Sequence, residues 1–145
     1  MYKSNQGFWV EMTFAAIAII LALAMANAYF NSPQPTTIVS SGTIYPLQPG
    51  RYQAINFTLN RDVRINGMFR STNGIRAYIM TSSQLTIFSS GGAASSYLFA
   101  TGRVTQGGIN TNLAQVKGAV IHLVFHNDNL KSNSTVTIMQ SITAT

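Results

Sequence analysis

The feature that most constrains the fold is an uncharged apolar stretch near the N-terminus, Met12–Phe30 (MTFAAIAIILALAMANAYF). As an α-helix, these 19 residues span roughly 28 Å, close to the ~30 Å hydrocarbon thickness of a bilayer. Trp9 and Tyr29 flank the run like the aromatic belts of membrane helices, and Pro33 prevents the helix from continuing far beyond it. We therefore predict a hydrophobic N-terminal helix, transmembrane or in a filament core, as a unit of residues 1–30.

Flanking charge gives this helix an expected orientation. Lys3 and the terminal amine precede the apolar run, and the next basic residue is Arg51. The positive-inside effect then places the N-terminus in the cytoplasm and the rest of the chain outside the cell membrane. Ala26-Asn27-Ala28 has the small-x-small form of a signal-peptidase site. Glu11 is an unusual neighbour for a signal sequence, so we expect the helix to be retained.

Glu11 itself has two interpretations. A carboxylate at the edge of an apolar helix is costly unless water or a cation reaches it. It lies either at the headgroup level or against a basic group of a neighbouring subunit, where it would set the helix register. The small residues Ala15, Ala22 and Ala26 permit close helix approach. We expect these four residues to contribute to assembly.

The segment Gly7-Phe8-Trp9-Val10-Glu11, followed by an Ala/Ile/Leu helix, resembles the start of type IV pilin-like proteins. That superfamily includes archaeal pilins, archaellins and membrane-bound accessory proteins of the archaellum. The resemblance covers about 25 residues. It implies a helix that bundles with its copies, a β-domain outside the cell, and for Glu11 the place of the family's glutamate. The sequence lacks a Lys or Arg directly before the small residue at which prepilin peptidase would cut.

The remaining chain has a different period. Residues 31–42 (NSPQPTTIVSSG) predict an extended linker. From residue 43 to 145, short runs alternate apolar and polar side chains, as in half-buried antiparallel strands. Ile121, Leu123 and Phe125 share one face, for example, with His122 opposite. Turn residues separate the runs about every ten positions, which predicts a mainly β, antiparallel β-sandwich or jelly-roll domain of seven to nine strands.

This domain is also similar, more diffusely, to small jelly rolls of the GOLD type, which are lumenal or extracellular interaction modules. The residues that carry this likeness are Gly67, Gly74-Ile75, Tyr78-Ile79-Met80, Leu123-Val124-Phe125 and Asn127. The likeness implies the same sandwich architecture.

The amino-acid composition limits the functions that this chain can have. Cysteine is absent, which excludes disulfides and thiolate chemistry. Only 8% of residues are charged, and the net charge of +6 arises from having three acids rather than from a Lys/Arg run. We therefore predict no nucleic-acid partner. A neutral polar surface suits contacts between copies, since burying charge is costly.

No residue cluster predicts catalysis, a cofactor or a metal. His122 and His126 lie roughly 13 Å apart on one strand face, too far to share a zinc ion. We expect both on an exposed outer face. Asp62 and Asp128 fall in turns, where Asp caps local backbone groups, and no G-x-S-x-G elbow is present.

Two surface features remain. If residues 63–70 and 75–80 form a hairpin, Arg64, Arg70 and Arg76 make one basic patch that contacts acidic glycans, lipid headgroups or another subunit. Asn56 and Asn133 match the N-glycosylation pattern.

Together these features predict a non-catalytic structural subunit or accessory component of a surface filament or envelope assembly. Its partners would be membrane lipid, copies of itself or a larger surface assembly, and a glycan or surface layer. The alternatives are a membrane-tethered module that binds a glycan or a protein, and an accessory subunit of a larger membrane complex or virion membrane.

Overall fold

The computed structural model describes residues 6–30, 34–94, 96–114 and 118–145, with side chains of the first helix described from residue 17 onward. The chain divides into two units, Met1–Gln34 and Pro35–Thr145. In its described residues, the first unit contains one helix. The second contains a short helix and eight strands in the part of the chain that is described.

The N-terminal helix, α1, runs from Gln6 to Phe30. Its apolar residues are spread around the whole circumference rather than along one stripe. Large apolar side chains from Ile17 to Phe30 are exposed, between 49% for Ile17 and 80% for Phe30. The predicted helix is thus present. Within the described residues, no helix has the length and hydropathy of a membrane span.

The second unit is mainly β, which confirms the prediction from period-two alternation. Its elements in chain order are β1 (Thr36–Val39), β2 (Ile44–Leu47), β3 (Tyr52–Thr58), β4 (Val63–Thr81), α2 (Ser82–Ser89), β5 (Phe99–Ala100), β6 (Val104–Leu113), β7 (Val120–His126) and β8 (Ser134–Ala144). All strand pairs are antiparallel.

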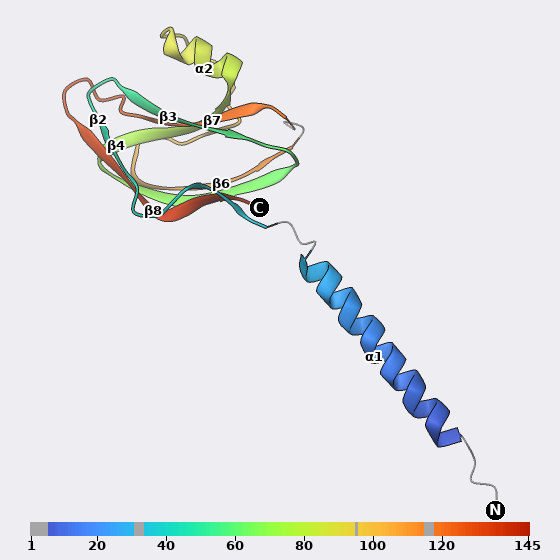
Figure 1. Ribbon diagram of the computed structural model, residues 1–145. Coiled ribbons are helices and arrows are strands. Elements are labelled where there is room, and N and C mark those ends of the chain that lie inside the picture. Colours follow the sequence, from blue (N-terminus) through green and yellow to red (C-terminus); the bar gives the residue numbers. More distant parts are fainter. Residues whose placement is uncertain (1–5, 31–33, 95, 115–117) are drawn as a thin grey trace, which may run out of the picture. The chain divides into compact units, whose positions relative to one another are not determined.

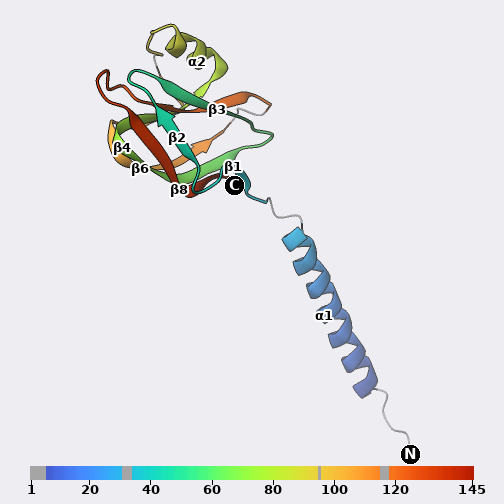
Figure 2. The ribbon, with the colours of Figure 1, turned by 60° about the vertical axis from the view of Figure 1, so that its left-hand side comes forward.

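The strands form two layers that share β4 (Figure 1). In the first sheet, β8 lies between β4 and the short strands β1 and β2, and β6 pairs with the other side of β4 (Figure 2). In the second sheet, β7 lies between β3 and β4, and β5 pairs with β4. Residues 63–75 of β4 belong to the first sheet and residues 76–81 to the second. The result is a sandwich resembling a jelly roll.

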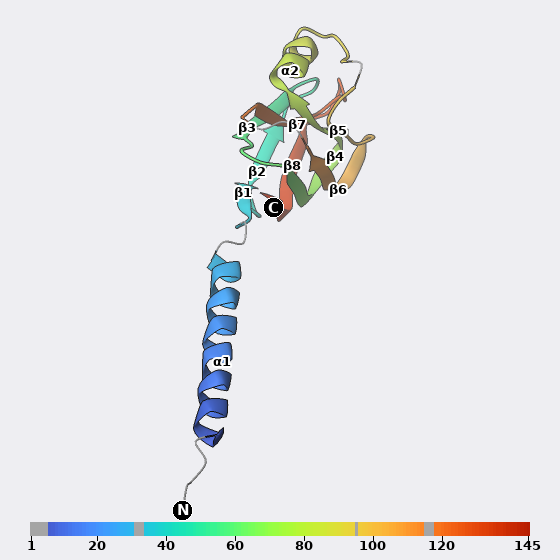
Figure 3. The same ribbon diagram turned by 90° about the vertical axis from the view of Figure 1, so that its right-hand side faces the viewer.

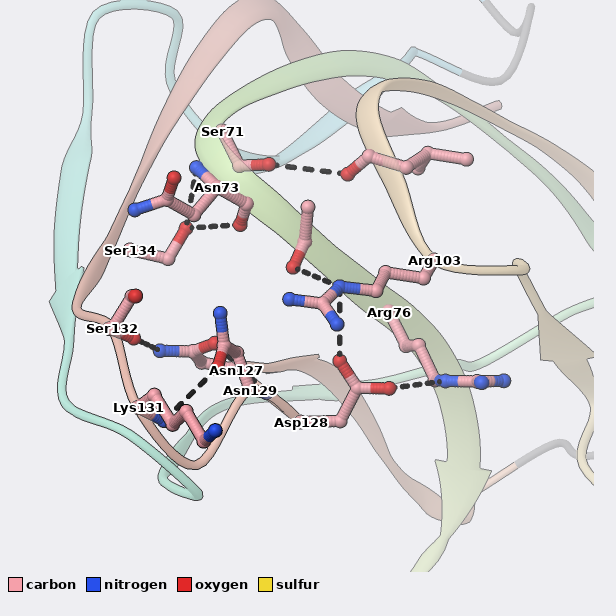
Figure 4. Close-up of polar contacts among 12 residues, drawn as sticks. Ser71, Asn73, Arg76, Arg103, Asn127, Asp128, Asn129, Lys131, Ser132 and Ser134 are labelled. Atoms are coloured by element: carbon pink, nitrogen blue, oxygen red, sulfur yellow. Dashed lines mark hydrogen bonds and ion pairs between the residues drawn. The ribbon is translucent and has the colours of Figure 1, made fainter.

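The continuous strand β4 corrects the hairpin expected from residues 63–70 and 75–80. Its register with β6 shifts between Arg70 and Ile75, where the strand leaves one sheet for the other. Side chains satisfy the backbone there: Ser71 Oγ donates to Val104 O (3.1 Å), and Ser134 Oγ donates to Asn73 O (2.7 Å) (Figure 4). The expected turn residues are therefore a supported bend within one strand.

The linker expected over residues 31–42 is also corrected. From Pro35 the chain belongs to the β unit, because β1 pairs with the end of β8, Thr37 opposite Thr143. The backbone of Gly42 donates to Ile138 O (2.7 Å), which fixes the following turn on the same strand. Only part of the Pro/Ser/Thr-rich segment therefore lies outside the β unit.

The core fills the space between the two sheets. Inward positions alternate as predicted, with Ile121, Leu123 and Phe125 all fully buried. Phe125 from the second sheet packs edge-on against Phe69 from the first, with ring centroids 5.2 Å apart. Such aromatic pairs stabilise a core beyond the area they bury.

The helix α2 covers the outer face of the second sheet (Figure 3). Leu85 and Phe88 pack there against a second buried cluster of Tyr78, Met80 and Val124. Thr81 caps the helix by accepting from Gln84 N, while the Gln84 side chain accepts from Thr81 N. This helix was not among the elements expected from the sequence, although Thr-x-x-Gln is the signature of a capping box.

Gly67 is a test of the packing between β4 and β8. A Cβ at this position would lie 2.8 Å from Ile142 Cα and 2.6 Å from its Cγ1, so the strands would have to separate. We expect Gly67→Ala to lower the free energy of unfolding by about 1–3 kcal/mol, measured by urea denaturation. Gly108→Ala is the matched control, because its nearest neighbour would be Gly67 O at 4.0 Å. Equal effects of the two variants would contradict this account.

Candidate functional site

An open cleft lies on the outer side of the second sheet, beside the C-terminal end of α2. Its volume is about 470 Å³, within the range of small-molecule sites. It is lined by Gly50, Arg51, Tyr52, Arg76, Tyr78, Phe88, Ser89, Gly91, Gly92, Ala93, Tyr97, His126 and Asp128. Three loops, the strands β3, β4 and β7, and the end of α2 therefore contribute to it.

Strand register creates the floor of the cleft. Tyr52 of β3 and Arg76 of β4 both lie opposite His126 of β7, so the three side chains form one row across the sheet. The next row is Ala54, Val124 and Tyr78. Because alternate residues of a strand point to the same face, both rows face α2.

Phe88 joins the helix to these rows. Its ring centroid lies 5.3 Å from Tyr52, 5.5 Å from Tyr78 and 5.1 Å from the His126 ring. Tyr97 packs on Tyr78 at 4.8 Å. Edge-on and tilted aromatic pairs of this kind are attractive and hold each ring in place. The apolar wall of the cleft is therefore a fixed aromatic cluster.

An ion-pair network forms the polar side. Arg76 Nε lies 2.8 Å from Asp128 Oδ2, and Arg103 Nε lies 3.5 Å from Asp128 Oδ1, a distance too long for a good hydrogen bond (Figure 4). Burial alone would raise the pKa of Asp128, but the hydrogen bond from Arg76 and the charge of Arg103 outweigh it and hold that pKa below its usual value. Asp128 is therefore ionised at neutral pH.

Asn127 positions the loops that carry these charges. It is fully buried, and its Nδ2 donates to the carbonyls of Ser132 (2.8 Å), Gln48 (3.2 Å) and Leu47 (3.3 Å). Its backbone N–H donates to Arg51 O (2.9 Å). The segment before β3 and the loop after β7 are thereby fixed to each other. Figure 4 shows the bond to Ser132 within that loop. The sequence predicted only a turn at this position.

His122 is not on an exposed face, which corrects the expectation. It is 7% exposed, because α2 covers this part of the outer face. Its Nδ1 lies 2.7 Å from Asn56 Oδ1 and its Nε2 lies 2.9 Å from Ser82 Oγ. A neutral ring protonated on Nδ1 satisfies both contacts, since the amide oxygen only accepts. These two hydrogen bonds connect Ser82, in the first turn of α2, to His122 of β7 and Asn56 of β3.

The structure separates the three arginines predicted to form one patch. Arg64 and Arg70 are exposed on the outer face of the first sheet, where Arg64 Nε donates to Asn110 Oδ1 (2.9 Å). Arg76 lies on the second sheet in the cleft. The prediction of a single patch was wrong, because it depended on a hairpin where β4 instead crosses between sheets.

The other predicted residues are placed as follows. Asn56 uses its amide oxygen to bind His122, whereas Asn133 is exposed in the loop before β8. Glycosylation of either stays a prediction. Ala22 and Ala26 lie on α1 and are exposed. The side chains of Glu11 and Ala15 lie outside the described residues.

Fold and cleft together define a small antiparallel domain, resembling a jelly roll, with an aromatic cleft on one outer face. No protein-family model matches the sequence, and no curated protein is similar to it. A structure of infectious bursal disease virus, Gt strain, is similar at 11% identity and a TM-score of 0.44, over 79% of this chain and 32% of that one. The VP2 subviral particle of infectious bursal disease virus is similar at 11% identity and a TM-score of 0.35, over 79% of this chain and 40% of that one.

The two histidines predict a pH dependence of stability. Burial lowers the pKa of His122, and burial also lowers that of His126, where Arg76 adds to the effect and Asp128 opposes it. Below the ordinary His pKa of about 6.5, the unfolded chain therefore binds protons that the folded chain does not. Because the unfolded chain binds more protons, the free energy of unfolding rises with pH. The protein therefore loses stability as the pH falls from about 7.5 to about 5.5.

Urea denaturation followed by near-UV circular dichroism across this pH range measures the slope. Asp128 stays ionised throughout, because its pKa is depressed. We expect His122→Gln and His126→Gln each to flatten the slope. A wild-type stability that is constant or increases on acidification would contradict the assignment.

Proposed function

We propose that this chain is a non-catalytic subunit of a surface assembly, in which α1 is buried among copies of itself or in lipid and the β unit makes the outer contacts. The observation that carries the proposal is the apolar surface all around α1. A helix that is apolar on every side is typical of a helix surrounded by protein or lipid.

The core of the β unit supports this division of roles. Its main cluster is built from residues between Val39 and Ala144, with side chains of both sheets. The exposed apolar side chains of α1 include Ile20 at 66% and Met25 at 68%. Each large apolar side chain gains about 1.5–3 kcal/mol on full burial, which favours association of such helices or their insertion into lipid.

The outer face of the first sheet is a suitable contact surface within such an assembly. A polar groove of about 720 Å³ lies on it, lined by Arg70, Ser71, Thr72, Thr105, Gln106, Thr135, Thr137 and Met139. Neutral hydroxyl and amide groups can exchange hydrogen bonds with water for hydrogen bonds with a partner at low desolvation cost. Met139, 54% exposed, and Met68 add adaptable apolar area.

The cellular placement belongs to the same proposal. The charge flanking the apolar run, Lys3 on one side and no basic residue before Arg51 on the other, favours an N-terminus in the cytoplasm and a β unit outside the cell. The resemblance of residues 7–11 to type IV pilin-like proteins favours a filament as the form of the assembly.

Purification of the full chain in detergent, followed by detergent removal with or without lipid vesicles, tests the proposal. We expect large assemblies or vesicle-bound protein, detected by sedimentation and negative-stain microscopy. Leu21→Lys places a charge on α1 and should reduce both by about tenfold or more, because a lysine in an apolar helix environment costs on the order of 2.5–3.5 kcal/mol.

Leu130→Lys is the matched control, since Leu130 is 80% exposed and lies in the loop after β7. It should assemble like the wild type. A wild-type chain that stays monomeric in buffer without detergent or lipid would refute the proposal.

A further inference from the structure

We propose that the cleft beside α2 binds a sugar residue that carries a negative charge, as a carboxylate or a sulfate. This binding activity is additional to assembly and does not depend on it. Three features of the cleft lead to this ligand class: an exposed aromatic surface, an excess of guanidinium groups and a rim of small residues.

The aromatic surface suits the apolar face of a pyranose ring. Tyr52 is 38% exposed at the cleft, while Phe88 and Tyr97 are partly buried. The C–H groups on one face of a sugar carry small positive partial charges and pack favourably on the negative face of an aromatic ring. Tyr52 and Tyr97 also present hydroxyl groups that can donate to sugar oxygens. The cleft volume of about 470 Å³ accommodates one or two sugar units.

The charges favour an anion. Arg51 and Arg76 line the cleft with Asp128, and Arg103 Nε lies 3.5 Å from Asp128 Oδ1. Asp128 is already shared between two arginines. Among the described residues, no carboxylate lies within ion-pair distance of Arg51. Two arginines line the cleft with one carboxylate that also pairs with Arg103, so the cleft has an excess of positive charge. The Arg51 side chain is free to form a paired hydrogen bond with a carboxylate or sulfate.

The rim keeps the cleft open. Gly91 has φ of +83°, and a Cβ there would meet nothing within 4 Å, so this residue sets the end of α2 without filling the cleft. Gly50, with φ of +66°, turns the chain just before Arg51 and is held by Asn129 O (3.1 Å). Both glycines adopt backbone conformations that favour glycine. A Cβ at Gly50 would lie 3.2 Å from Leu130 Cδ2, so of these two residues only Gly91 borders open space.

Titration calorimetry of the full chain in detergent tests the proposal with three oligosaccharides of equal length. One contains glucuronic acid, one is sulfated without uronic acid, and one is neutral. We expect at least one acidic oligosaccharide to bind about tenfold or more tightly than the neutral one, because a hydrogen bond to a charged group contributes about 1.5–3 kcal/mol. The two acidic ligands distinguish a carboxylate from a sulfate site.

Variants locate the site. Arg51→Gln should lower the affinity for the acidic ligand about tenfold and reduce its salt dependence, and Tyr52→Ala should weaken all binding. Ser89→Trp fills the cleft from the exposed end of α2 and should abolish binding without touching the core. Arg64→Gln is the matched control, since Arg64 lies on the other sheet. Near-UV circular dichroism verifies that each variant is folded.

Three results would contradict the proposal. Equal affinity for neutral and acidic ligands, or no binding of any of the three, overturns the proposal. So does an equal loss of affinity in Arg64→Gln and Arg51→Gln, which would indicate attraction by the net charge of +6 rather than a site.

Discussion

The pairing of β4 with both sheets is the constraint on which the rest of the β unit depends. Its first part lies between β8 and β6, and its last six residues pair with β7. One continuous backbone thus sets the spacing and register of both layers. The close approach of Gly67 to Ile142 and the fully buried contact of Phe69 with Phe125 follow from that geometry.

The same constraint produces the cleft. Because Arg76 is the first residue of β4 in the second sheet, its register with His126 puts it in line with Tyr52 of β3. Buried hydroxyl groups stabilise the bend that precedes Arg76. Ser134 is only 1% exposed, and its Oγ donates to Asn73 O (2.7 Å). Buried backbone groups left without partners are costly, so these bonds help to maintain both the bend and the cleft.

Local patterns in the sequence predicted much of the fold. Alternation identified the buried face of β7 correctly, since the apolar residues on one side of that strand all lie in the core. The same reasoning misplaced His122, because alternation gives the side of a sheet but not whether a later segment covers it. It also predicted a hairpin from residues 63–70 and 75–80, with a turn at Thr72-Asn73-Gly74 between them. These residues do bend the chain, but pairing with β6 and β8, about thirty or more residues away, decides that the strand continues.

The cleft could not be predicted from local sequence patterns, because the residues that line it are far apart in the chain. Arg51 lies in the loop before β3, Phe88 on α2 and His126 at the end of β7, and only strand register and the position of α2 bring them together. A signal did exist in Thr81-x-x-Gln84, which marks the start of α2 and thus the covered outer face. Asn127 gave no such signal, since a buried asparagine that binds three carbonyls has the same local sequence as an exposed turn.

The ion pair of Arg76 with Asp128 is better explained by positioning than by stability. Its side chains are 43% and 23% exposed, and pairs with that much solvent contribute little to the free energy of folding. The chain has only three acidic residues, and one of them contacts two arginines here. Held by Asp128, Arg76 keeps its guanidinium at the edge of the row formed by Tyr52 and His126. The carboxylate thereby fixes the position of the Arg76 guanidinium and partly offsets its charge. The Arg51 side chain, which lines the same cleft, has no ion-pair partner among the described residues.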